Sequence, residues 1–278
     1  MSYLENPATL VPCPTDGRLG RISLVGAGPG AADLLTLRAV RCLGQADVVY
    51  YDRLVEPEVL AFARPEAERV FVGKEVGAHS WPQARIDATI VAAALQGKRV
   101  VRLKSGDPSI FGRASEEITA ARAHGILVEV IPGVTAASAA AASLCQPLTK
   151  RGETDRVVLA TATCCTGDMP AKIGDIAQPG TSLVFYMAMN QLVTLSAELI
   201  CAGVAPDQPV TVAANVSRPN ERILKTTVSQ LWHDCQLAKI RNPAVILVEL
   251  AKEAAADQRV VSLADHGCSD PLSMGRMA

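Results

Sequence analysis

The segment GAGPGA at positions 26–31 directly follows the first apolar run of the chain and has the composition of a nucleotide-binding loop. Its glycines and final alanine match the G-x-G-x-x-G/A pattern, in which the backbone closely approaches a pyrophosphate, and Asp52 stands where that pattern places a ribose-binding acid. Pro29 weakens the match because proline removes a backbone N–H from the phosphate cradle. Three interpretations stay open: a nicotinamide nucleotide, another adenosine-type ligand, or a turn that binds nothing.

A second candidate loop lies within RLKSGDPSIFGRASEE at 102–117. The Gly-Asp-Pro sequence at 106–108 predicts a tight turn, because Asp and Pro favour turns and Gly permits positive φ. Open α/β sheets bind ligands at the carboxyl ends of their parallel strands, which is where this loop is expected. Ile110 and Phe111 offer an apolar wall for such a ligand.

Arg113, Glu116 and Glu117 stand at the start of the next predicted helix. Acidic side chains stabilise the first turn of a helix, which is a sufficient explanation for the two glutamates, whereas a cation is disfavoured there. Arg113 is therefore the better candidate for a ligand contact. Guanidinium groups bind carboxylates through paired hydrogen bonds, so a set of loop cations indicates a substrate with several carboxylates. The other cations that follow predicted strands are Arg53, Lys74, Lys150, Arg151, Arg218 and Arg222.

Composition and charge exclude several classes of protein. The 278 residues are 49% hydrophobic with a mean hydropathy of +0.21, which excludes a disordered chain. Lys and Arg (27) nearly balance Asp and Glu (28), and the formal net charge of -1 argues against a nucleic-acid partner. The loop cations could together line one pocket while the whole chain stays nearly neutral.

The cysteine pattern and the N-terminal residues bear on the compartment. No apolar run approaches the roughly 20 residues that span a bilayer, and the N-terminus lacks the basic and apolar regions of a secretory signal, so no membrane partner is expected. The eight cysteines show no CxxC spacing and the four histidines are scattered. The sequence therefore predicts reduced thiols, no metal site and a cytoplasmic protein.

Strand and helix patterns alternate along the first half of the chain. Continuous apolar strands between helices are typical of a parallel sheet that is covered on both faces. Strands are predicted at 21–28, 47–55, 69–73, 99–106 and 127–133, and helices at 33–46, 82–98 and 115–125.

An Ala-rich helix at 134–145 begins a second half with further strands and helices. Strands are predicted at 156–163, 181–189, 209–216 and 243–250, and helices at 190–203 and 228–235. We therefore predict an α/β fold with two α/β domains. The expected organisation is an irregular N-terminal extension (1–19), an N-terminal α/β domain (20–133), a C-terminal α/β domain (134–258) and a flexible tail (259–278).

Taken in order, these segments resemble the tetrapyrrole methylase family, and within it the uroporphyrinogen-III C-methyltransferases, over approximately residues 21–250. The resemblance is carried by LVGAGPGAADLLTLRA, VVYYDRLV, VGK, RLKSGDPSIFGRASEE, VIPGVTAASAAAA, PLTKRG, FYMAM and NPAVILVEL. It implies two α/β domains with S-adenosylmethionine in the cleft between them, S-adenosylhomocysteine as product, no metal, and a homodimer. It also implies methylation of uroporphyrinogen III at C2 and C7, through precorrin-1 to precorrin-2, for sirohaem, cobalamin or haem d1 biosynthesis.

The resemblance also implies roles for individual residues. The family's proton acceptor falls on Asp52 and its proton donor on Lys74, while Arg113 and Arg151, with Glu116 nearby, would meet the substrate carboxylates. We expect Arg113, as a carboxylate clamp, to matter more for the chemistry than Asp52. The family's S-adenosylmethionine contacts fall on Pro29, Ser105, Gly106, Asp107, Ile110, Thr135, Ala136, Met187, Val216 and Ala244.

The chain departs from the family pattern at three places. Ser105 and Val216 stand where the family often has glycine, and backbone contacts survive such a replacement only if the local φ is not positive. TCCTGD at 163–168 replaces a common Thr-Gly-His stretch. Two other functions stay open: a nicotinamide oxidoreductase, based on GAGPGA and Asp52, and a tetrapyrrole-binding module without catalysis.

Overall fold

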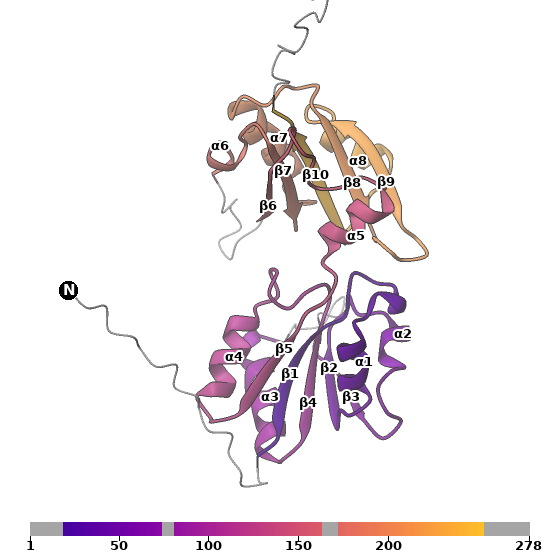
Figure 1. The fold of residues 1–278 in the computed structure, drawn as a ribbon, viewed down its shortest axis with the longest axis vertical. Coiled ribbons are helices and arrows are strands. Elements are labelled where there is room, and N and C mark those ends of the chain that lie inside the picture. Colours follow the sequence, from indigo (N-terminus) through magenta and orange to yellow (C-terminus); the bar gives the residue numbers. More distant parts are fainter. Residues whose placement is uncertain (1–18, 74–80, 163–171, 253–278) are drawn as a thin grey trace, which may run out of the picture.

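Two five-stranded sheets, one above the other in Figure 1, form the body of the protein. The computed structural model describes residues 19–73, 81–162 and 172–252. The expected extension at 1–19 and the tail at 259–278 therefore lie almost entirely outside the described residues. The expected α/β class is confirmed, with strands and helices in alternation over most of the chain.

The first sheet is parallel throughout, with strand order β3-β2-β4-β1-β5. Its strands are β1 (Arg21–Gly26), β2 (Val48–Tyr51), β3 (Glu68–Phe71), β4 (Arg99–Lys104) and β5 (Leu127–Ile131). The apolar side chains of β1, β2 and β4 are buried on both faces, as the continuous hydrophobic runs predict, whereas the edge strands β3 and β5 are more exposed.

Helices cover both faces of the first sheet (Figure 1). On one face, α1 (Leu37–Leu43) and α2 (Pro57–Leu60) bury Ala39, Leu43 and Val59. On the other face, α3 (Gln83–Leu95) and α4 (Ala114–Arg122) pack against the strands, with Ile90 and Ala121 fully buried. The helix predicted at 33–46 is shorter than expected, because a 3-10 turn (Ala32–Leu34) precedes α1 and Thr36 caps it.

The second sheet is mixed, with strand order β6-β7-β10-β8-β9. Only β6 and β7 are parallel neighbours in this sheet, for which no strand direction was predicted. The C-terminal strand β10 inserts antiparallel between β7 and β8, and β8 and β9 pair antiparallel. The strands are β6 (Arg156–Thr161), β7 (Thr181–Tyr186), β8 (Pro209–Ala214), β9 (Arg222–Thr227) and β10 (Ala244–Leu250).

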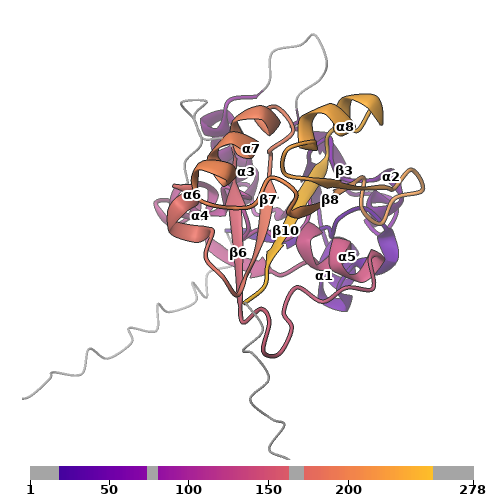
Figure 2. The same ribbon diagram turned by 90° about the horizontal axis from the view of Figure 1, so that it is seen from above.

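The two faces of the second sheet are covered unequally. Figure 2 shows α6 (Ile173–Ile176), α7 (Leu192–Cys201) and α8 (Leu231–Leu237) on one face, where they enclose a large apolar core. The Ala-rich helix α5 (Ala136–Ser143) packs on the other face against a smaller cluster. Strand β9 was not predicted, because it is an edge strand with mostly exposed or half-buried side chains and carries no apolar run.

Candidate functional site

A cavity of about 440 Å³ lies where the carboxyl ends of the first sheet face the second sheet. This volume is ordinary for a small-molecule site. All ten residues that the family resemblance assigns to the methyl donor line it, although they come from six separate segments. They are Pro29, Ser105, Gly106, Asp107, Ile110, Thr135, Ala136, Met187, Val216 and Ala244. The structure brings these residues together, and their contact with a ligand stays a prediction.

The loops after β1 and β4 form one wall of the cavity by pairing backbone to backbone. Gly28 N–H donates to the Gly106 carbonyl (3.2 Å), and Gly106 N–H donates to the Gly28 carbonyl (2.7 Å). Gly26 also packs so closely on Gly133 that a Cβ there would lie 2.6 Å from the Gly133 backbone. The glycines of the GAGPGA loop therefore serve close packing between loops, and α1 begins only at Leu37. This is not the short strand-to-helix turn of a dinucleotide site.

Asp107 fixes the turn after β4 with its side chain. One carboxylate oxygen accepts a hydrogen bond from Ser109 N–H (2.7 Å) and the other from Gly133 N–H (3.0 Å). Burial alone raises the pKa of Asp107, but hydrogen bonds from Ser109 and Gly133 outweigh it and hold that pKa below its ordinary value. The two oxygens thus close the turn and hold it to the start of the Gly133 segment, which fixes its shape at the cavity wall.

Backbone conformation distinguishes several lining residues. Ser105 and Val216 do not have positive φ, so the contacts expected at these two non-glycine positions are sterically allowed. Phe111 (φ 51°) and Met187 (φ 53°) are left-handed, a strained state for non-glycine residues that is typical of functional sites. Their large side chains are also 41% and 48% exposed, which leaves apolar surface for a ligand.

Tyr186 is a lining residue that sequence reasoning missed, although it stands within the FYMAM segment. Its hydroxyl lies 2.6 Å from the Thr135 hydroxyl and accepts a hydrogen bond from Ala137 N–H (3.0 Å). Its ring lies 5.2 Å from the ring of Phe111, centroid to centroid. Tyr186 therefore joins β7 of the second sheet to the start of α5 and to the loop after β4.

Arg218 closes another side of the cavity by crossing between the two halves of the protein. Its guanidinium donates to the Leu54 carbonyl (2.7 Å) and pairs with Glu56 (2.9 Å), both of which follow β2. Of the loop cations that the sequence singles out, Arg53 and Arg218 line this cavity. The side chain of Arg218 is mostly buried, so it acts as a bridge within the protein.

Asp52, the predicted proton acceptor, follows β2 directly and is partly exposed beside lining residues Arg53 and Leu54. One carboxylate oxygen accepts a hydrogen bond from Leu54 N–H (3.0 Å), and the other lies 3.5 Å from the Arg102 guanidinium. Lys74, the predicted proton donor, lies outside the described residues.

Arg113 begins α4 with a left-handed backbone (φ 56°) and forms an exposed ion pair with Glu116. Two hydrogen bonds join them, from Nε (3.1 Å) and Nη2 (2.6 Å). The unfavourable position of a cation at a helix start is thus offset by a neighbouring carboxylate. Neither residue lines the cavity, but Phe111, two residues before Arg113, does.

Arg151 does not join these residues, which corrects the expectation that it lies with Arg113 in the cleft. It lies in an exposed turn whose neighbour Lys150 pairs with Glu249 (2.7 Å). Glu249 is five residues beyond the cavity residue Ala244 along β10, about 17 Å at the rise of an extended strand. Arg151 is therefore at the opposite end of the second sheet.

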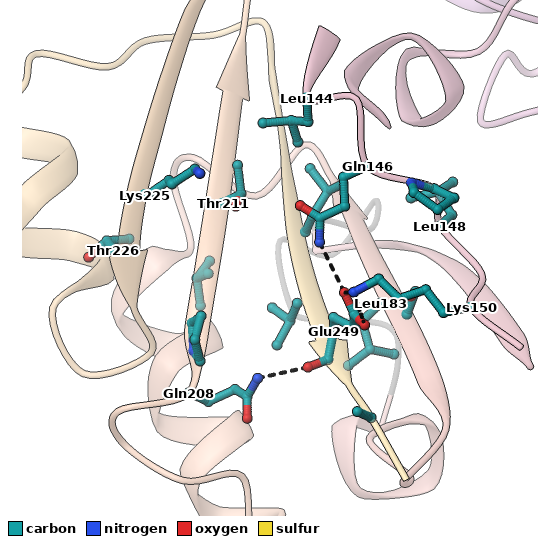
Figure 3. Close-up of a pocket in the computed structure, with 17 residues that line it drawn as sticks. Leu144, Gln146, Leu148, Lys150, Leu183, Gln208, Thr211, Lys225, Thr226 and Glu249 are labelled. Atoms are coloured by element: carbon teal, nitrogen blue, oxygen red, sulfur yellow. Dashed lines mark hydrogen bonds and ion pairs between the residues drawn. The ribbon is translucent and has the colours of Figure 1, made fainter. Parts of the chain in front are cut away.

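A second cavity of about 420 Å³ lies at that opposite end, on the face of the sheet that α5 leaves open. Figure 3 shows Gln146 and Lys150 directed at Glu249, and Gln208 hydrogen-bonded to the Glu249 carbonyl. Its charged groups are thus largely paired within the protein, and none of the residues predicted to bind or react lines it.

Two general properties of the described residues bear on function. Across 19–73, 81–162 and 172–252, His, Cys, Asp and Glu do not form a group of three that could hold a metal ion. Within the same ranges, every helix is too short or too polar to cross a membrane.

Comparison with known proteins gives consistent matches over most of the chain. The family model of the tetrapyrrole (corrin/porphyrin) methylases matches residues 21–231. The siroheme synthase of Hydrogenovibrio crunogenus is 39% identical over 249 residues, which are 87% of this chain and 53% of that protein. The siroheme synthase of Edwardsiella ictaluri is 43% identical over 82% of this chain and 49% of that protein. The chain thus spans about half the length of these relatives.

Solved structures share the same fold. The uroporphyrin-III C-methyl transferase of Thermus thermophilus, complexed with S-adenyl homocysteine, is 36% identical and superposes with a TM-score of 0.71 over 83% of this chain and 92% of that one. A cobalt precorrin-4 methyltransferase is 32% identical, with a TM-score of 0.75 over 86% of this chain and 98% of that one.

Proposed function

Because the chain belongs to the tetrapyrrole (corrin/porphyrin) methylases, we propose that it transfers methyl groups from S-adenosylmethionine to C2 and C7 of uroporphyrinogen III, giving precorrin-2 by way of precorrin-1. The product would enter sirohaem, cobalamin or haem d1 biosynthesis. The observation that carries the proposal is that all ten predicted donor-binding residues line one cavity. The similarity to a uroporphyrin-III C-methyl transferase over nearly its whole length supports the choice of substrate.

The cavity has the chemistry that an adenosyl ligand requires. Phe111 and Met187 present exposed apolar surface, and the polar residues Ser105, Asp107 and Asn190 line the same cavity. Pockets of this kind bind through apolar contact and orient the ligand through a few polar groups. A nicotinamide nucleotide is less well supported, because Gly26 and Gly28 are used in packing between loops.

S-adenosylmethionine would supply a methyl group that is already activated on a sulfonium, so the contribution of the protein is mainly geometric. The wall made by the Gly28 and Gly106 loops would hold the donor, and the rigid sheets would fix its distance from the substrate carbon. Asp52 would accept the proton that the ring must lose, and Lys74 would act as the proton donor. A positioned base of this kind contributes roughly 10²–10⁴-fold.

The carboxylates of the substrate would compete with Glu116 for the guanidinium of Arg113. This exposed pair can open at low cost, because solvent screens surface ion pairs strongly. Arg113 then gains a bidentate partner on the substrate, and its clamp would hold the ring against the cavity mouth. Arg151 is left out of this site because of its distance from the cavity.

We also propose a homodimer in a reducing, cytoplasmic compartment, with domains at 20–133 and 134–258. The second sheet supports self-association, since Val157 and Ile223 are exposed on its two edge strands, β6 and β9. In the described part of the chain, Cys42, Cys145, Cys201 and Cys235 are free thiols, which supports the compartment. Light scattering would test the dimer.

The proposed function is tested by ligand selectivity and by transfer of label. S-adenosylhomocysteine should raise the melting temperature, because a ligand that binds only the folded state stabilises it, whereas NADH should not. Label from methyl-tritiated S-adenosylmethionine should enter uroporphyrinogen III. Stabilisation by NADH would favour the oxidoreductase, and binding of both substrates without transfer would favour a tetrapyrrole-binding module.

A further inference from the structure

Four charged side chains form a continuous network that ends at Asp52, directly before the lining residues Arg53 and Leu54. Lys104 Nζ donates to both carboxylate oxygens of Glu117 (2.8 Å each), and Arg102 Nε donates to one of them (3.2 Å). The same Arg102 places Nη2 3.5 Å from Asp52. The network therefore runs from α4, across β4, to the residue that follows β2.

Burial makes this network costly unless its charges balance. The side chains of Arg102 and Lys104 are only 6% exposed and that of Glu117 is fully buried, whereas Asp52 is 29% exposed. Buried ions lose their hydration, and an unpaired one costs several kcal/mol. Two cations against Glu117 alone would leave a buried positive charge. Asp52 supplies the second negative charge and is the most exposed of the four.

The Glu117 carboxylate has enough hydrogen-bond donors without Arg102. Lys104 already occupies both of its oxygens, and Gln83 on α3 also approaches it (3.3 Å). Burial lowers the pKa of Lys104, and the neighbouring Arg102 charge lowers it further, so Arg102 disfavours the charged form of Lys104. A network that served only to join α4 to the sheet would be complete without Arg102. Its guanidinium instead lies between Glu117 and Asp52 and contacts both.

We propose that Arg102 is a positioning residue for Asp52. Its guanidinium forms an ion pair with one carboxylate oxygen while Leu54 N–H donates to the other, so that the carboxylate is kept in one orientation beside the lining residues Arg53 and Leu54. Glu117 and the Leu103 carbonyl (2.7 Å from Arg102 Nη1) hold the guanidinium itself. The inference rests on the proposed function, because Asp52 is the group that Arg102 positions.

The same strand offers a matched control. Arg99 at the start of β4 pairs with Asp47 (2.9 Å), which precedes β2 just as Asp52 follows it. The two Arg–Asp pairs thus join the same two strands at opposite ends. Arg99→Lys makes the same chemical change as Arg102→Lys, but at the end of the sheet remote from the cavity.

The test is a double-mutant cycle with Arg102→Lys, Asp52→Asn and the double variant, since only interacting residues deviate from additivity. Arg102→Lys should lower kcat about 100-fold, the effect of a small misplacement of a reacting group. KM for uroporphyrinogen III and the Kd for S-adenosylhomocysteine should stay unchanged. In the Asp52→Asn background the same change should alter kcat less than about two-fold. Arg99→Lys should leave kcat unchanged.

A second cycle in urea needs no substrate. Arg102→Lys and Asp52→Asn each change the unfolding equilibrium constant by some factor. The factor measured for the double variant should differ from the product of these two factors by about five-fold or more. If Arg102→Lys does not fold, Arg102→Gln enters both cycles in its place. Multiplicative losses in either cycle, or full activity of the single variant, would overturn the role of Arg102. A wild-type protein that transfers no methyl group would instead overturn the proposed function.

Discussion

The hydroxyl of Tyr186 lies 2.6 Å from the hydroxyl of Thr135, and this contact ties the end of β7 to the start of α5 at the cavity wall. Ala137 N–H also donates to Tyr186. One side chain of the second sheet therefore fixes the segment that joins the two halves of the protein.

Tyr186→Phe should destabilise the protein and weaken ligand binding. Loss of the hydroxyl leaves the Ala137 N–H without its acceptor, at a cost of about 1–3 kcal/mol in the free energy of unfolding. Urea denaturation measures this cost, and calorimetry should show weaker S-adenosylhomocysteine binding. Thr181→Val on the same strand is the control. The Thr181 hydroxyl is buried without a partner among the described residues, so its loss should be neutral or stabilising. Equal costs for the two variants would contradict the assignment.

Gly106→Ala should weaken the binding of S-adenosylhomocysteine more than it weakens the fold. Gly106 has φ +70° and lines the cavity, so alanine adds a methyl group there. Gly125 has φ +68° with nothing within 4 Å of its Cβ position, and it lies after α4. Both alanine variants should lose about 1–2 kcal/mol of stability, the cost of a left-handed non-glycine residue. Only Gly106→Ala should raise the Kd; an equal rise for Gly125→Ala would place the ligand elsewhere.

Arg218→Gln should loosen the connection between the two halves around the cavity. The substitution removes the ion pair with Glu56 and shortens the side chain that donates to the Leu54 carbonyl. We expect the Kd for S-adenosylhomocysteine to rise about ten-fold, equivalent to roughly 1.4 kcal/mol. Arg222→Gln, an exposed change at the start of β9, is the control and should leave the Kd unchanged. An unaltered Kd in Arg218→Gln would show that the bridge does not support the site.

Stability at acid pH should depend on Asp47. Hydrogen bonds from Arg99, together with the charge of Arg64, hold the pKa of Asp47 far below its ordinary value. A depressed folded pKa contributes stability above the unfolded value of about 3.9, and this is lost as pH falls towards the folded value. The stability difference between wild type and Asp47→Asn should therefore be constant from about pH 7 to 5 and shrink below about pH 4.

Urea titrations at each pH measure that difference. Asp207→Asn is a suitable control, because the described residues provide no ion-pair partner for Asp207. Its effect should be small at every pH. A difference for Asp47→Asn that grows on acidification would contradict the assignment.

Sequence reasoning located the cavity wall because that wall is made of loops directly after strands. Local patterns identified the loops at 26–31 and 102–117, including Gly106, because the ends of parallel strands meet at one edge, whereas Ala136 and the lining residues after it were expected only from the family resemblance. The first sheet was predictable for the same reason. The mixed second sheet was not, because β10 carries an apolar run like that of a parallel strand, yet it pairs antiparallel with both of its neighbours.

Side-chain partners escaped prediction because they depend on tertiary contacts. Glu117 looks like an acid that stabilises a helix start, yet it is the buried centre of the Arg102 network. Arg151 looks like one more loop cation, but its turn lies at the wrong end of β10. Tyr186 has the pattern of an ordinary strand residue, and only the position of α5 gives its hydroxyl a role.

The central claim is that this cavity brings an activated methyl group to a tetrapyrrole. The most direct test is the mass of the tetrapyrrole recovered after the purified protein is incubated without oxygen with uroporphyrinogen III and S-adenosylmethionine. The account predicts a product heavier by two CH2 units, because each added methyl group is accompanied by the loss of one proton, with a singly methylated species at early times. Recovery of the unmethylated tetrapyrrole, from protein shown by calorimetry to bind both substrates, would contradict it.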